Sequence, residues 1–512
     1  MKQVIITVCL LSLLDVWSAA RACGKQEDQG REPQTQSSVT DHHLAAGGKS
    51  FDYTATAGTL VILDDEGNPM ANIGYVAYTR HVPKGGTQQR PVLFAFNGGP
   101  GSSSMLLHMG LLGPRRVLIA DPGTAAPPGY KTVDNEFSLL DKTDVVMIDP
   151  VGTGFSHAVC DKKDRDFTNV DADVDSVTRF ITQYLSDHNR WTSPKYLLGE
   201  SYGTTRAAAL VNYARAQHSL IFNGLVLVSM ATDMELVSSG LPGNERPYPV
   251  FLPGFAAVAW YHHLVAGQPP DLVPFLAEVR RFAAGPFTAA LLKGDALPDD
   301  ERDAVAEQIH KYTGLSAEYV KAANLRVSEF AFAHELFKSR HQLVSRLDGR
   351  FLGLALDPLQ KNADYDPALA AIDPIYSAAL QDYLREDLKF GSGRNYQTTN
   401  AWIGDHWDFR HKPGGNLYGG SYESQPIVNS GVDLAQALVQ EANLRVLVLS
   451  GYFDLGSPFT VAEYLVSHLG VPKEAAARVQ IKYYEAGHMM YVNTPSLEKV
   501  KRDLDAFVDS TH

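Results

Sequence analysis

A short apolar run that breaks into Gly-x-Ser-x-Gly is the feature that most restricts how this chain can fold. Residues 196–198 are Tyr-Leu-Leu, and Gly199-Glu200-Ser201-Tyr202-Gly203 follows directly. A serine on a sharp strand-to-helix turn needs a small residue two positions before and after it, because the turn crowds the backbone. Apolar residues then recur at helical spacing, at Ala207, Leu210, Val211 and Ala214. The pattern predicts a buried strand, a tight turn that carries Ser201, and a helix.

Two later strand-like runs end in residues that could activate this serine. Residues 444–450 lead through Gly-Tyr-Phe to Asp454, which places a carboxylate just beyond a buried strand. Residues 479–484 lead through Glu-Ala-Gly to His488. A serine hydroxyl is a weak nucleophile until an imidazole takes its proton, and the imidazole needs an acid to orient it and stabilise its cation. The order serine, acid, histidine therefore predicts Ser201 as nucleophile, Asp454 as acid and His488 as base.

A glycine-rich turn earlier in the chain is a candidate oxyanion site. It follows the strand-like residues 91–96 and reads Asn97-Gly98-Gly99-Pro100-Gly101-Ser102-Ser103-Ser104. Glycines let backbone amides approach a substrate oxygen that side chains would block, and a tetrahedral intermediate needs two such donors. We predict the amides of Gly99 and of Tyr202, the residue after the nucleophile. The turn lacks the Lys-Ser/Thr ending of a phosphate-binding loop.

Two groups of residues have side chains that could bind a metal: Asp171, Asp173 and Asp175 in the first, and His406, Asp408 and His411 in the second. The first group lacks the glycine and the glutamate that a calcium loop needs at its sixth and twelfth positions, so we expect a solvated helix face. The second group lies in a Trp-, Gly- and Pro-rich stretch typical of a loop. We therefore predict neither a metal nor a cofactor.

Four motifs, in this order along the chain, resemble those of the serine carboxypeptidase family: residues 97–104, residues 149–156 (Asp-Pro-Val-Gly-Thr-Gly-Phe-Ser), residues 199–203 and residues 487–489 (Gly-His-Met). The resemblance implies an α/β-hydrolase fold, with a mostly parallel central sheet flanked by helices, that removes C-terminal residues from peptides at acidic pH. It implies that Asn97 and Glu200 hold the terminal carboxylate of the substrate. It also implies that Gly99 and Tyr202 form the oxyanion hole. The loop that ends at Phe155 is either a wall of the site or a structural turn.

The cysteines depart from the family pattern. Family members commonly carry a cysteine where Ser102 stands and have several disulfides, whereas this chain has 3 cysteines, at Cys9, Cys23 and Cys160. Because Cys9 lies in a predicted signal peptide, at most one bridge can form in the mature chain, between Cys23 and Cys160.

The first residues have the pattern of a secretory signal peptide. Lys2 precedes an apolar run over residues 4–14, and Ala20-Arg21-Ala22 offers a small-x-small cleavage site. We therefore expect residues 1–22 to be a signal peptide and the protein to be exported. The scarcity of cysteines favours a bacterial periplasm or the exterior as its compartment. A lipidated Cys23 is an alternative, although Ala-Arg-Ala is a poor match for a lipoprotein cleavage box.

The charge balance limits which classes of partner the protein can bind. The chain has 45 Lys and Arg against 58 Asp and Glu, which gives a formal net charge of −13. An acidic surface repels nucleic acids and anionic membranes, and no later run of about 18 apolar residues could span a bilayer. We expect peptide substrates, as the resemblance implies, no nucleic acid and no membrane span. The oligomeric state stays open, with a homodimer among the alternatives.

Most of the extra length of the chain lies between nucleophile and acid. About half of the chain separates Ser201 from Asp454, whereas only a short segment separates Asp454 from His488. A Pro- and Gly-rich passage after residues 225–228 leads into mostly helical patterning. We predict a disordered lead-in at residues 23–50, a hydrolase core at residues 51–235 and 431–512, and a helical cap over the active site at residues 236–430.

Three alternatives stay open. The same three side chains would serve an esterase or an acyltransferase, which would be indifferent to a free C-terminal carboxylate. A non-catalytic binding protein could keep the fold, although the presence of all three side chains disfavours it. The sequence around Asp454 matches the family less closely than that around Ser201, so Asp408 is the alternative acid.

Overall fold

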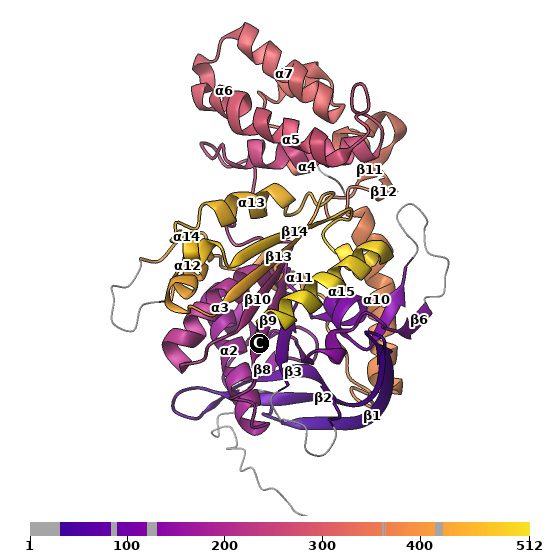
Figure 1. Cartoon of the computed structure of the whole chain (residues 1–512), viewed down its shortest axis with the longest axis vertical. Helices are drawn as coiled ribbons and strands as arrows, with labels where there is room; N and C mark the ends of the chain where they lie inside the picture. The colour runs from indigo at the N-terminus through magenta and orange to yellow at the C-terminus, as the bar shows by residue number, and fades with distance from the viewer. Residues whose placement is uncertain are drawn as a thin grey trace, which may run out of the picture.

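The computed structural model describes residues 31–82, 90–119, 131–360, 363, 365–414 and 423–511. The predicted signal peptide, residues 1–22, and Cys23 lie outside the described residues. The described part of the chain forms a central sheet with helices on both faces and a further group of helices that stands away from the sheet (Figure 1). No helix within these ranges is both long enough and apolar enough to span a membrane.

The central sheet is mostly parallel. Its strands are β1 (Gln36–Ala46), β2 (Lys49–Leu63), β3 (Pro69–Arg80), β4 (Val92–Phe96), β7 (Asp144–Ile148), β8 (His157–Ala158), β9 (Lys195–Glu200), β10 (Gly224–Val228), β13 (Arg445–Gly451) and β14 (Val479–Tyr484). They lie in the order β1-β2-β3-β7-β4-β9-β10-β13-β14, and β8 pairs with β3. From β7 to β14 every neighbouring pair is parallel, whereas β1, β2 and β3 are antiparallel.

Buried apolar side chains cover both faces of the sheet. Alternate positions of β4 belong to different core clusters: Val92, Phe94 and Phe96 to the first, Leu93 and Ala95 to the second. Helices on the first face are α2 (Val170–Asp187), α3 (Tyr202–His218), α12 (Gly431–Gln440) and α13 (Phe459–Ser467). Helices on the second face are α1 (Met105–Leu107), α10 (Pro367–Glu386) and α15 (Thr494–Asp509). This arrangement confirms the predicted α/β-hydrolase fold.

Part of the predicted disordered lead-in is a strand instead. β1 pairs with β2 over the whole of its length. Only Leu44 and Ala46 of β1 are buried, so the sequence carries little apolar signal there. Main-chain hydrogen bonds to β2, which apolar patterning does not report, hold this edge strand in place. The prediction of disorder is therefore wrong for residues 36–50.

The first part of the long insertion is a helical lobe. Its helices are α4 (Pro247–Tyr261), α5 (Leu272–Phe282), α6 (Thr288–Lys293), α7 (Asp299–Thr313), α8 (Ala317–Ala322) and α9 (Glu329–Glu335). Inside it, the ring of Phe255 stacks on that of Phe332 at 4.3 Å. Figure 1 shows α4 to α7 beyond α13, and Arg280 of α5 reaches Glu463 of α13 at 2.7 Å.

The second part of the insertion folds back onto the core. β11 (Gln342–Val344) and β12 (Leu352–Leu354) form a hairpin, and α10 lies on the second face of the sheet. The helix lies there because it carries a buried apolar stripe at a spacing of four residues, at Ile372, Tyr376, Leu380 and Leu384. The prediction of one cap over residues 236–430 is corrected in this respect: only the lobe stands apart, and α10 belongs to the core.

Candidate active site

The Gly-x-Ser-x-Gly sequence forms the predicted strand-to-helix turn. β9 ends at Glu200 and α3 begins at Tyr202, so Ser201 stands between them with φ 58° and ψ −128°. Positive φ is costly for a residue with a Cβ atom, and such strain occurs at functional sites. A Cβ atom on Gly199 would overlap the backbone of Gly203. Gly199 is therefore required by the turn itself, whereas a Cβ atom on Gly203 would crowd the backbone of Phe96 and Asn97.

Neighbouring strands hold this turn in place. The amide of Ser201 donates to the carbonyl of Val228 at the end of β10, at 2.9 Å. The hydroxyl of Thr204 donates to the Ser201 carbonyl at 2.7 Å and accepts from the amide of Ala231 at 2.8 Å. The strained serine is thus tied to the chain on both sides of the turn.

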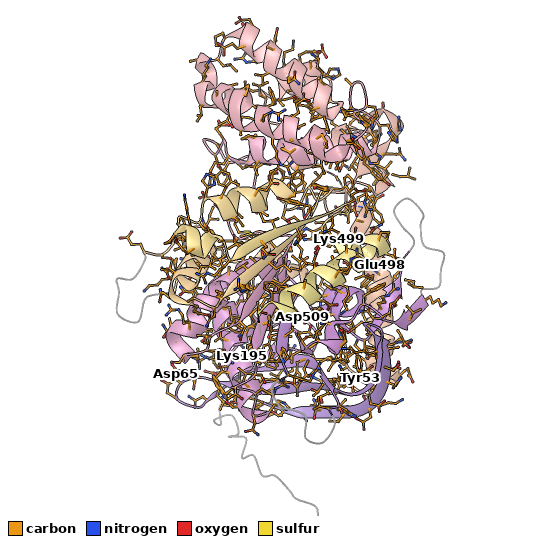
Figure 2. All side chains as sticks on the ribbon, in the orientation of Figure 1. Tyr53, Asp65, Lys195, Glu498, Lys499 and Asp509 are labelled. Atoms are coloured by element: carbon orange, nitrogen blue, oxygen red, sulfur yellow. The ribbon has the colours of Figure 1, made fainter. Side chains whose placement is uncertain are left out.

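The three candidate residues lie at the same edge of the sheet. β9, β13 and β14 are parallel, and Ser201, Asp454 and His488 each follow the carboxyl end of one of them. Lys195, labelled in Figure 2, begins β9 and marks the opposite edge. Between these strands Ser229, directly after β10, donates its hydroxyl to the His488 carbonyl at 2.8 Å.

Asp454 and His488 are buried and paired. Nδ1 of His488 lies 2.8 Å from Oδ2 of Asp454. Burial alone would raise the pKa of Asp454, but His488 and the amides of Gly456 and Ser457 hold it below its usual range. Burial alone would lower the pKa of His488, whereas Asp454 and Glu200 raise it overall. The pair can therefore accept and hold a proton.

Asp408, the alternative acid, lies elsewhere. Its carboxylate accepts two hydrogen bonds from Nε of Arg410, at 2.9 and 3.0 Å, and both groups are on the surface. Its amide donates to the carbonyl of Thr168 at 3.1 Å. Of the two acids considered, Asp454 is the one that lies against the histidine.

The glycine turn packs directly on the start of α3. A Cβ atom on Gly98 would overlap the amide nitrogen of Tyr202, so only glycine allows this approach. Gly99 has φ 91°, a conformation that favours glycine. Within the described residues, neither the Gly99 amide nor the Tyr202 amide donates to a protein acceptor. Two backbone donors are thus available beside Ser201.

Asn97 and Glu200 form a buried pair beside the candidate nucleophile. Nδ2 of Asn97 donates to Oε1 of Glu200 at 3.0 Å, and Oδ1 of Asn97 accepts from the amide of Leu107 at 3.0 Å. Burial raises the pKa of Glu200 to about 7, an effect that His488 and the nearby hydroxyl of Tyr491 reduce. Oε2 of Glu200 makes no hydrogen bond of normal geometry within the described residues. A carboxyl group that is protonated below neutral pH therefore lies next to Ser201.

A buried ion pair under the glycine turn was not predicted from the sequence. Nε of Arg206 donates to Oδ2 of Asp173 at 2.7 Å, and Nη1 donates to the carbonyl of Asn97 at 2.8 Å. Both side chains are buried. The expectation of a solvated face is therefore wrong for Asp173, because α3 supplies it with a cation. The one sequence signal for this pair is an arginine among the apolar residues of α3.

Residues 149–156 brace the glycine turn. The carboxylate of Asp149 accepts from the amide of Ser104 at 2.9 Å and from the hydroxyl of Tyr396 at 3.0 Å. Burial raises the pKa of Asp149 to about 6, and these two donors reduce that effect. Phe155 packs against Phe390 and Tyr396, at 5.3 and 5.1 Å between ring centroids. The loop therefore acts as a structural support of the glycine turn.

A strand-like segment of the insertion covers the same turn. The amide of Ser103 donates to the carbonyl of Thr398 at 2.9 Å, and Ser102, where family members carry a cysteine, forms a β-bridge with Thr399. The amide of Asn400 donates to the carbonyl of Gly101 at 2.7 Å. Backbone pairing thus holds the turn at the position where family members commonly carry a cysteine.

The residues of the two metal-type groups have other partners. Asp171 contacts His411 at 2.6 Å, Asp173 pairs with Arg206, and Asp175 pairs with Arg179 at 2.8 Å. His406 stacks on Trp402, and Asp408 pairs with Arg410. Within the described ranges, no group of three or more His, Cys, Asp or Glu side chains is arranged to hold a metal ion.

Cys160 is disulfide-bonded. Cys23, the one partner that the sequence leaves for it in the mature chain, lies outside the described residues. The backbone near Cys160 is fixed as well, because its amide donates to the carbonyl of Arg31 at 3.1 Å.

The middle of the sequence is similar to a known protein family. The family model for serine carboxypeptidases matches residues 75–233, and no curated protein matches the chain in sequence. Three of the four motifs lie in the matched region, at residues 97–104, 149–156 and 199–203. The fourth motif, Gly487-His488-Met489, lies outside it.

Solved structures similar to the chain have low identity and low TM-scores. A proline iminopeptidase from Mycobacterium smegmatis is 14% identical, with a TM-score of 0.35 and coverage of 88% of this chain and 98% of that one. A peroxisomal α/β-hydrolase from Saccharomyces cerevisiae is 12% identical, with a TM-score of 0.36 and coverage of 94% and 92%. The fold assignment rests on the sheet topology and not on these likenesses. What the comparisons show is therefore a likeness of residues 75–233 to the serine carboxypeptidase family.

Proposed function

We propose that the protein is an exported serine carboxypeptidase that removes C-terminal residues from peptides and works best at acidic pH. One observation carries the proposal: the buried carboxyl of Glu200, paired with Asn97 at 3.0 Å, lies next to Ser201 and has its pKa raised by burial to about 7. The family match over residues 75–233 supports the same class of enzyme. Export rests on the N-terminal sequence pattern alone.

In the proposed reaction, Oγ of Ser201 attacks the carbonyl carbon of the last peptide bond while Nε2 of His488 takes its proton. The paired carboxylate of Asp454, at 2.8 Å from Nδ1, stabilises the imidazolium that results. The amides of Gly99 and Tyr202 donate to the oxyanion. His488 then gives its proton to the leaving amine, and water hydrolyses the acyl-enzyme by the same steps.

The proposed role of Glu200 is to distinguish a free C-terminus from an internal peptide bond. Two carboxyl groups at hydrogen-bond distance cannot both stay ionised at low cost, so one must hold a proton. Below about pH 7 Glu200 holds it and can donate to the substrate carboxylate, and Asn97 is placed to donate as well. As the pH rises through that value, Glu200 ionises and repels the substrate.

The first test compares two N-blocked peptides that differ only at the C-terminus, one a free acid and the other an amide. The mature protein should remove single residues from the free acid at mildly acidic pH and largely spare the amide, as read by mass spectrometry. Ser201→Ala, the control, should abolish this turnover, because the nucleophile is lost. Equal cleavage of the two peptides, or cleavage of neither, would contradict the proposal and favour an esterase or acyltransferase.

The second test addresses Glu200 itself. Glu200→Gln keeps a hydrogen-bond donor but removes the ionisation, so kcat/KM for the free-acid peptide should fall less steeply towards neutral pH than in the wild type. An ester substrate without a carboxylate is the matched control, because its pH profile should lack the wild-type limb near pH 7. A variant with an unchanged profile for the free-acid peptide would rule out this role.

A further inference from the structure

The sequence Ser345-Arg346-Leu347-Asp348-Gly349-Arg350 connects β11 to β12 and carries no motif that points to catalysis. We call residues 345–350 the clasp segment. Figure 1 shows the hairpin to which it belongs between the helical lobe and the sheet. Although it is part of the insertion, this segment lies against the two loops that carry Asp454 and His488.

The clasp segment is bonded to the loop of the acid, residues 452–457. The carbonyl of Arg346 accepts from the amide of Leu455 at 2.8 Å, and the amide of Gly349 donates to the carbonyl of Phe453 at 2.8 Å. These two bonds lie on either side of Asp454 in the sequence. They fix the backbone of the residues before and after the acid.

The same segment is bonded to the loop of the histidine, residues 485–488. The carbonyl of Leu347 accepts from the amide of His488 at 2.7 Å, and Oδ2 of Asp348 accepts from the amide of Gly487 at 3.2 Å. A Cβ atom on Gly487 would overlap Asp348. The clasp segment therefore packs on Gly487 with no room for a side chain between them.

Two of the three charged side chains of the clasp segment are paired and buried, and neighbouring elements hold its backbone. Asp348 and Arg350 are joined at 2.6 Å, with side chains 5% and 4% exposed. The carboxylate of Asp366 accepts from the amides of Arg346 and Leu347 at 2.8 and 3.2 Å. The carbonyl of Gly349 accepts from the ring of His262, at the end of α4, at 2.7 Å.

We propose that the clasp segment positions Asp454 and His488 relative to each other, and that Asp348 is the positioning residue that joins it to the histidine loop. The proposal rests on the proposed roles of Asp454 and His488. It goes beyond them because it gives a role to residues that take no part in the proposed reaction. One rigid segment bonded to both loops fixes their separation, which a catalytic acid–histidine pair needs to within a fraction of an ångström.

The charges that face His488 determine in which direction its pKa should change if the clasp segment is disturbed. Burial lowers the pKa of His488, Asp454 and Glu200 raise it, and Arg346 of the clasp segment lowers it by a smaller amount than Asp454 raises it. If the histidine loop shifts away from Asp454, the largest favourable effect is lost. The pKa of His488 should then fall. The acidic limb of the activity profile should move to lower pH with it.

The test compares two buried carboxylates that each pair with a cation. Asp348→Asn removes the carboxylate of the clasp segment, and Asp141→Asn removes one that pairs with Lys501 at 2.8 Å near the end of the chain, away from the three candidate side chains. The readout is the rate at which Ser201 is acylated by an activated ester, which needs only an activated serine. We expect Asp348→Asn to slow acylation by at least about ten-fold and to move its acidic limb to lower pH. Asp141→Asn should lower the melting temperature without either effect.

Wild-type acylation rates and an unchanged acidic limb in Asp348→Asn would overturn the proposal. Should that variant fail to fold, Arg350→Lys keeps the buried charge but loses the two-pronged contact with Asp348. It should show a smaller loss of the same kind, and a wild-type profile there would also overturn the proposal. Acylation by the ester with no cleavage of peptides would contradict the carboxypeptidase activity and still test the clasp segment.

Discussion

Among single residues, His411 shows how a buried charge can join distant parts of the chain. Its Nδ1 lies 2.6 Å from Asp171 at the start of α2, and its Nε2 lies 2.8 Å from Asp433 in α12. Burial alone would lower the pKa of His411, but the two carboxylates raise it to about 9. The imidazole is therefore charged throughout the acidic and neutral range, and it holds two helices of the first face together.

Replacing this histidine should be costly at low pH and less so at high pH. Removing one partner of a buried ion pair costs about 3–5 kcal/mol, so His411→Gln should lower the free energy of unfolding by about that amount at acidic pH. Because the folded pKa is raised, the stabilisation is complete below about pH 6.5 and is lost as the pH rises through about 9. Urea unfolding measures the difference. His468→Gln, at an exposed site, is the control, and equal losses in the two variants would contradict the prediction.

At the scale of elements, the glycine turn and α3 must approach each other without side chains between them. Gly98→Ala would place a methyl group on the amide nitrogen of Tyr202, where only backbone atoms could move away. We expect kcat/KM to fall by at least about 100-fold, because the oxyanion donors and the nucleophile would be pushed apart. Gly285→Ala is the matched control, since a Cβ atom there meets nothing within 4 Å. Full activity in Gly98→Ala would contradict this account of the turn.

The elements that could be predicted from the sequence are those whose signals are local. The strand, turn and helix around Ser201 are encoded in one short segment. Asp454 follows an apolar strand that is buried along nearly all of its length, and His488 follows a strand at the edge of the sheet. β1 could not be predicted in this way, because it is held by main-chain bonds to β2. The Arg206–Asp173 pair was missed for a different reason: its members are on separate helices that only the fold brings together.

At the scale of the whole molecule, the insertion does more than extend the chain. Its clasp segment is bonded to the acid and histidine loops, and residues 397–400 are bonded to the glycine turn and to the loop that braces it. The helical lobe is separate from both contacting segments. It precedes them in the sequence, and Figure 1 shows it beyond α13. Length alone predicted an insertion, but which part of it would reach the site depends on tertiary contacts.

The ionisable groups with the largest shifts give the whole protein a pH dependence of known sign. Burial raises the pKa of Glu200 and of Glu441 to about 7, so the folded state holds protons that the unfolded state has released. His411, with its pKa raised to about 9, acts in the same sense at higher pH. His108, whose pKa burial lowers to about 3, acts in the opposite sense, but only below about pH 6.5.

As the pH rises, the two carboxyls favour a loss of stability from about pH 4.5 to 7 and His411 favours one from about pH 6.5 to 9, because over these ranges the folded state binds more protons than the unfolded state does. From about pH 6.5 to 9 the loss therefore comes first from all three groups and then from His411. The melting temperature of the wild type should therefore fall steadily over this range. The double variant Glu441→Gln/His411→Gln removes two of the responsible groups and should show a flatter, lower curve. A wild-type melting temperature that stays constant or rises over the range would mean that the buried carboxyls gain partners on ionisation. Their proton affinity could then not be used to explain an acidic optimum of activity.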